Sequence, residues 1–140
     1  MSAPAEGSPA DDPLVRMAAV GLAAGRLAIG AGLWLAPVPV ARALGFGRLD
    51  ERALAIGRIA ATRDLVLGAW QLRSLGDRTE LGRSSTAIAV VDAGDALTFA
   101  LALRGADGAR RAGGRGLLGA VPASLAGFWL ARRLRVSESK

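Results

Sequence analysis

The sequence predicts an all-α fold, an integral membrane four-helix bundle. Three observations support it. Of the 140 residues, 51% are apolar. Four long apolar stretches alternate with short polar segments, and the charges inside the stretches are isolated, with apolar residues around the rest of each helix. The alternative is a soluble four-helix bundle, whose helices show a polar stripe at a spacing of 3.6 residues. That alternative would leave long Ala, Leu and Val surfaces in water, so the membrane bundle is favoured.

The four predicted spans are each long enough to cross a bilayer, since about 20 helical residues cover the hydrocarbon layer. Two prolines, Pro37 and Pro39, end the first span. The polar segment GDRTELGRS before the third span and the Gly- and Arg-rich segment GADGARRAGGR before the fourth are expected to be loops. The spans cover residues 14–36, 53–75, 85–104 and 116–134.

We expect one domain, residues 14–135, with a tail at each end. Residues 1–13 contain three Pro, three acidic residues and no basic residue, which is typical of a disordered tail. The acidic start also argues against a secretory signal, which begins with positive charge. Residues 136–140 are expected to be a short C-terminal tail.

The composition excludes much of enzyme chemistry. The chain contains no Cys and no His, and its only Lys is Lys140. Thiolate and imidazole catalysis, disulfides and zinc or haem ligation are therefore excluded, and we expect no cofactor. The net charge of +6 is spread over every hydrophilic segment, which does not favour nucleic-acid binding. No nucleophile constellation is visible, so the residues favour a role other than catalysis.

Six charged residues lie near the middle of the first three predicted spans. A charge at the bilayer centre costs about 2.5–3.5 kcal/mol on insertion scales, so such groups face inward and pair. Three positive and three negative charges balance each other. The predicted intramembrane cluster consists of Arg26, Arg58, Arg63, Asp64, Asp92 and Asp95.

The spacing of these residues predicts their pairing. Asp92 and Asp95 are three positions apart and share one helix face. Arg63 and Asp64 are adjacent, about 100° apart around the helix, so they point to different neighbours. We expect Arg63 or Arg58 to pair with the two acids of the third span, and Asp64 to pair with Arg26.

Two interpretations of the cluster remain open. It is either an ion-pair network that sets the helix register, or a proton or ion relay or a polar pocket for a small substrate. The D-x-x-D spacing of Asp92 and Asp95 also suits a hard cation. Nearby arginines oppose cation binding, so no metal site is predicted.

A stripe of small residues marks the fourth span. Helices in lipid associate by close backbone approach, which small side chains allow. Gly119, Ala123, Gly127 and Ala131 repeat at every fourth position and are predicted to form a packing groove. A partner in this groove is either another copy of the chain or a different membrane protein.

Four segments together resemble a known kind of membrane protein. GRLAIGAGLWLAP, ARALGF, GRIAATRDLVLGAW and VVDAGDAL, within residues 20–104, are similar to small bacterial DoxX-like membrane proteins, in particular an uncharacterised family of unknown function. The resemblance implies a four-helix integral membrane bundle. It supplies no catalytic residue for this chain.

These observations lead to an expectation for location and role. We expect a multi-pass protein of the bacterial inner membrane, with both ends in the cytoplasm by a margin of one basic residue. The expected role is that of an accessory or interaction subunit. The alternative is a small transporter or proton-coupled carrier that uses the midplane carboxylates.

Overall fold

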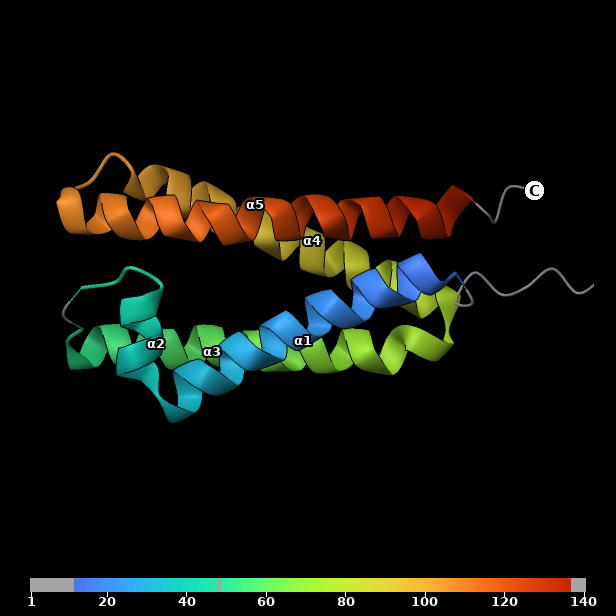
Figure 1. The fold of residues 1–140 in the computed structure, drawn as a ribbon, viewed down its shortest axis with the longest axis horizontal. Helices are drawn as coiled ribbons and strands as arrows, with labels where there is room; N and C mark the ends of the chain where they lie inside the picture. The colour runs from blue at the N-terminus through green and yellow to red at the C-terminus, as the bar shows by residue number, and fades with distance from the viewer. Residues whose placement is uncertain (1–11, 48, 137–140) are drawn as a thin grey trace, which may run out of the picture.

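A computed structural model describes residues 12–47 and 49–136, and this part of the chain is all-α, with no strand. Four long helices carry the fold, with a short helix after the first and a 3₁₀ turn after the second (Figure 1). The elements are α1 (Pro13–Leu35), α2 (Pro37–Ala43), α3 (Glu51–Arg73), η2 (Ser74–Gly76), α4 (Arg78–Ala102) and α5 (Asp107–Val136). Each predicted span therefore lies on a long helix.

Three of the long helices begin at an aspartate that caps them. The Asp12 carboxylate accepts a hydrogen bond from the backbone N–H of Leu14 at 2.9 Å. Asp50 and Asp77 do the same at the starts of α3 and α4. A side-chain cap of this kind stabilises a helix by about 1 kcal/mol because it pairs an N–H that has no partner within the helix.

The first of these caps corrects the predicted boundary of the N-terminal tail. The tail was expected to include Asp12 and Pro13, but Asp12 is the cap of α1 and Pro13 is its first residue. Proline suits the first helical position because its missing N–H would have no partner there. The C-terminal tail was expected to begin at residue 136, but Val136 is the last residue of α5. The expected disorder of residues 1–11 and the rest of the expected tail, 137–140, lie outside the described residues.

Both segments predicted as loops are largely helical. Helix α4 begins at Arg78, not at residue 85, and α5 begins at Asp107, not at residue 116. The predictions were wrong because they followed hydropathy, whereas arginine and alanine favour helix regardless of hydropathy. The Asp77 cap and the negative charge of Asp107 in the first turn of α5 also favour these earlier starts.

The long helices form two pairs, α1 with α3 and α4 with α5, as Figure 1 shows. Glycines bring the first pair close together. A Cβ at Gly30 would lie 2.8 Å from the carbonyl oxygen of Ala61, and a Cβ at Gly68 would lie 3.0 Å from that of Ala23. Real Cβ atoms essentially never come closer than 3.0 Å to such atoms, so Gly30 requires glycine at this helix separation, and a side chain at Gly68 would be tightly crowded.

Helix α5 packs on α4 through small residues that overlap only in part with the predicted groove. A Cβ at Gly127 would lie 2.9 Å from Cβ of Ala89, and the Ser124 hydroxyl donates a hydrogen bond to the Ala89 carbonyl at 3.1 Å. A Cβ at Gly116 would overlap the ring of Phe99. By contrast, Gly119 is exposed and has no atom near the place of a Cβ. Of the predicted packing groove Gly119, Ala123, Gly127 and Ala131, the structure therefore buries Gly127 and Ala131 within the chain and leaves Gly119 exposed.

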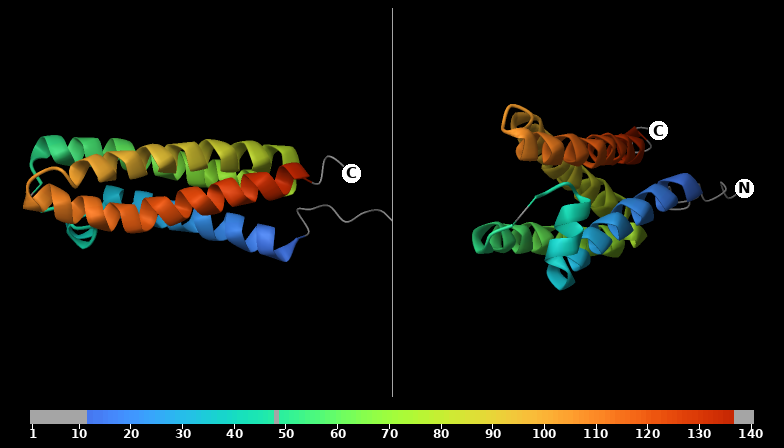
Figure 2. Two further views of the ribbon diagram at one scale, coloured as in Figure 1. Left: turned by 90° about the horizontal axis from the view of Figure 1, so that it is seen from above. Right: turned by 60° about the vertical axis from the view of Figure 1, so that its left-hand side comes forward.

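The two pairs share an apolar cluster at one end of the bundle, where α1 begins and α5 ends (Figure 2). Arg78, at the start of α4, donates from Nε to the carbonyl oxygen of Leu134 at 2.8 Å. This bond ties the last turn of α5 to the first turn of α4. The cluster contains Val15, Ala19, Leu81, Leu130 and Leu134.

Much of the outer surface is apolar. Exposed residues include Met17 at 71%, Ile59 at 71% and Leu118 at 78% of their full surface. Among the described residues, two helices, α1 and α4, are long and apolar enough to cross a membrane. Helices α3 and α5 do not meet the same criterion, because charges interrupt the apolar stretch of α3 and arginines flank that of α5.

Candidate functional site

Five of the six predicted cluster residues meet between α1, α3 and α4. The arginine–aspartate network, as we call it, is centred on Arg26, whose side chain is 9% exposed. Arg26 Nη1 donates to Asp64 Oδ1 at 3.2 Å, and Nη2 donates to Asp92 Oδ1. The network comprises Arg26, Arg63, Asp64, Asp92 and Asp95.

A second arginine extends the network along α4. Arg63 donates to both carboxylate oxygens of Asp95, at 2.9 and 2.7 Å, in a bidentate pair. The same guanidinium lies 3.3 Å from Asp64 Oδ1, which therefore joins the two arginines. Charge-assisted bidentate pairs are among the stronger hydrogen bonds in proteins, so Arg63 and Asp95 hold α3 and α4 in register.

The predicted pairing can now be compared with the contacts. The structure brings Asp64 to Arg26, and Arg63 to Asp95, as the spacing suggested. Asp92, however, pairs with Arg26 rather than with an arginine of α3. Arg26 thus forms ion pairs with two carboxylates from two different helices.

Arg58 lies outside the network, contrary to the prediction. Its side chain is exposed, and its guanidinium lies over the ring of Trp34, 5.8 Å from the ring centroid. The indole N–H of Trp34 donates to the Thr62 hydroxyl at 3.1 Å, which orients the ring. Arg58 and Arg63 are about 140° apart around α3, so they cannot both face the network.

Sequence reasoning missed a second buried polar contact between α3 and α4. Gln71 is fully buried, and its Nε2 donates to the Ser85 hydroxyl at 3.5 Å. Ser84, also fully buried, donates to the carbonyl of Leu81. A lone Gln in the apolar stretch of α3 is the signal that could have indicated this contact, because a buried amide needs a partner.

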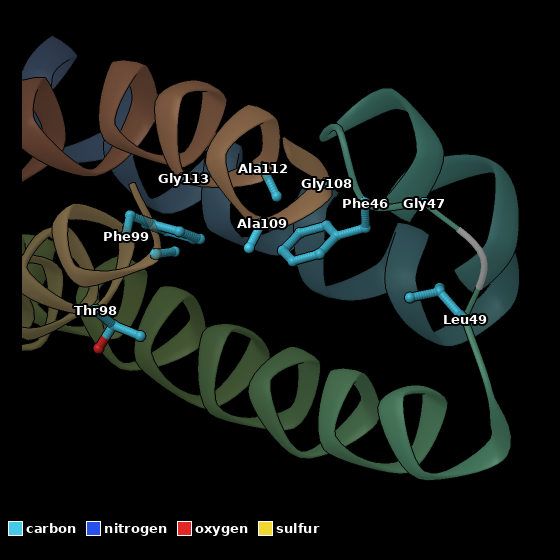
Figure 3. Close-up of a pocket in the computed structure, with 10 residues that line it drawn as sticks. Phe46, Gly47, Leu49, Thr98, Phe99, Gly108, Ala109, Ala112 and Gly113 are labelled. Carbon is cyan, nitrogen blue, oxygen red and sulfur yellow. The ribbon is translucent and has the colours of Figure 1, made fainter. Parts of the chain in front are cut away.

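A separate pocket of about 340 Å³ lies at the opposite end of the bundle from the shared apolar cluster. Its walls are apolar, and the ring of Phe46 reaches toward Ala109 of α5 while Phe99 forms another side (Figure 3). The one hydroxyl in the lining, that of Thr98, donates to the Gly94 carbonyl. The lining therefore offers shape and apolar contact but no acid, base or metal ligand.

The ionisable groups of the network are also insufficient for a metal site. Among the described residues, no group of three or more Asp, Glu, His or Cys side chains is arranged to hold a metal ion. Each of the three network carboxylates is instead paired with an arginine. The chemistry available in the network is ion pairing and proton binding.

Comparisons with known proteins give no family for the chain. No family model matches it, and neither curated proteins nor solved structures gave a match. The resemblance to DoxX-like proteins stays a prediction, so the function is argued from the geometry.

Proposed function

We propose that the chain is an integral protein of the bacterial inner membrane, with all four long helices crossing the bilayer, and that it acts as an accessory or interaction subunit. The observation that carries this proposal is the distribution of polarity. Large apolar side chains such as Ile59 and Leu118 are exposed, while Arg26 and Asp92 are buried between helices. The exposed apolar side chains are favourable in contact with lipid, and ion pairing lowers the cost of placing the buried charged side chains in a membrane.

The outer face of α5 supports the interaction role. Leu118 and Leu125 are exposed, and Gly119, which follows Leu118, is also exposed, with no atom within 4 Å of the place of a Cβ. Small residues on an exposed membrane helix allow a second helix to approach closely. We therefore place the partner helix at Gly119, the part of the predicted groove that the chain does not fill itself.

The partner can be sought by purification from native membranes in a mild detergent. We expect a stoichiometric membrane partner with the wild-type chain and its loss with Gly119→Leu, which should fold because nothing occupies the space next to Gly119. Ala43→Leu, on exposed α2 away from this face, is the matched control. A chain that is released without detergent, or that is always monomeric and free of partners, would contradict the proposal.

A second candidate function is that of a small proton-coupled carrier. It is favoured by the gradient of exposure along the network, from 7% for the Asp92 side chain to 30% for Asp95 and 38% for Arg63. Such a gradient offers a polar route from the surface to a buried carboxylate. In proteoliposomes, a carrier should lose flux in Asp95→Asn and keep it in Arg58→Gln; equal flux in both variants would exclude this role.

A further inference from the structure

The charges of the network do not balance once Arg58 is outside it. Two arginines, Arg26 and Arg63, face three aspartates. With all carboxyl groups ionised, the network would carry one net negative charge. An uncompensated charge at this depth is costly, so a cation is expected to accompany it.

The imbalance falls on Asp92. Its Oδ1 accepts from Arg26, but its Oδ2 is buried and has no hydrogen-bond partner among the described residues. The Asp92 side chain is more than nine-tenths buried, at 7% exposure. A buried carboxylate oxygen without a donor is unfavourable, because it has lost its hydrogen bonds to water and has formed none within the protein.

The charged groups that surround Asp92 come from three helices. Arg26 comes from α1, Arg63 and Asp64 from α3, and Asp95 lies one turn further along α4. Helix α5, which packs on α4, has no ionisable residue between Arg115 and Arg132. No further arginine is therefore available from α5 to balance Asp92.

We propose that the network holds one bound proton, on Oδ2 of Asp92. The step is simple: one O–H bond forms between a proton from water and the carboxylate, and no electron is transferred. The resulting carboxyl group keeps its hydrogen bond from Arg26 through Oδ1 and makes the five-residue network neutral. A metal ion does not fit, because each of the three carboxylates is already paired with an arginine through at least one oxygen, and hard cations take six or more oxygens.

Infrared spectroscopy of the chain in lipid nanodiscs tests this site directly, since a protonated carboxyl group has a C=O band distinct from that of a carboxylate. At neutral pH, the wild-type chain should show one such buried band, which Asp92→Asn removes. Arg58→Gln changes the charge outside the network and should leave the band intact. A wild type without the band, or a band that survives in Asp92→Asn, would overturn the proposal.

Folding of the variant gives a second measurement. Asparagine is uncharged like the protonated acid, so Asp92→Asn should keep the wild-type helix content and should melt at the same temperature with Na⁺ as with K⁺. Unfolding of Asp92→Asn under conditions where Arg58→Gln is folded would show that a negative charge is required, and a wild-type melting temperature that rises only with Na⁺ would assign the site to that ion. Either result would overturn the proposal. The inference rests on the proposed membrane location; a chain that does not enter nanodiscs contradicts the location, whereas one that enters without the band contradicts the proton site alone.

Discussion

At the scale of single residues, Arg26 has the largest structural role in the network. It reaches from α1 to carboxylates of both α3 and α4, and so joins three helices. The sequence could indicate that Arg26 needs acids, because a lone arginine in an apolar stretch must pair. It could not indicate that one guanidinium would serve two acids, since that depends on how closely α1, α3 and α4 meet.

Replacement of Arg26 should be far more damaging than replacement of Arg58. Arg26→Gln leaves Asp64 and Asp92 without their shared partner, and removal of one partner from a buried ion pair costs about 3–5 kcal/mol. Arg58→Gln removes an exposed cation–π contact with Trp34, worth about 0.5–1 kcal/mol. Denaturant titration in detergent measures both free energies of unfolding. Equal losses in the two variants would mean that the buried pairs contribute no more than the exposed contact.

The sequence was sufficient to predict that Arg58 lies on a different face of α3 from Arg63. Counting 100° per residue separates Arg58 from Arg63 by about 140°, which places them on different faces of one helix. The prediction grouped them by depth alone and so assumed a neutral network. A prediction of which charged side chains meet needs their angular position around the helix as well as their position along its axis.

At the scale of elements, the four long helices follow from hydropathy and from their aspartate caps, but the way they pair does not. The i+4 stripe on the fourth span was visible, whereas the actual seam includes Gly116, Ser124 and Gly127, at spacings that vary with the local contact. Alanine and glycine are so frequent here that several stripes exist on one helix. Only the crossing of α4 and α5 selects among them.

The seam predicts opposite results at two glycines of α5. Gly127→Val places atoms against Ala89 of α4 and should cost about 1–3 kcal/mol, the usual range for overpacking. Gly119→Val meets no neighbour and should change stability by no more than about 0.5 kcal/mol. Thermal unfolding followed by circular dichroism can compare the two variants. If Gly119→Val were the less stable, α5 would pack through the other face.

At the scale of the whole molecule, the start of α1 and the end of α5 lie at the same end of the bundle, as expected for an even number of crossings (Figure 1). The connection through η2 lies at this end, and the connection between α4 and α5 lies at the other. The proposed topology therefore puts η2 on the cytoplasmic side and the start of α5 on the outer side.

Cysteine labelling can test this topology, because the natural chain has no cysteine. Gly76→Cys and Gly108→Cys introduce side chains where no neighbour is close. With an impermeant maleimide, Gly76→Cys should react only in inside-out vesicles and Gly108→Cys only in right-side-out vesicles. Labelling of both from one side would contradict four crossings.

The division of charge between the two helix pairs has a consequence for biosynthesis. Within the network, α1 and α3 contribute two positive charges and one negative, while α4 contributes two negatives. In a membrane, helices leave the translocon in chain order, so the first pair would enter lipid with one arginine unmatched until α4 arrives. In the proposed membrane topology, the first half of this protein is therefore incomplete on its own, and the two aspartates of α4 supply the carboxylate that the unmatched arginine lacks.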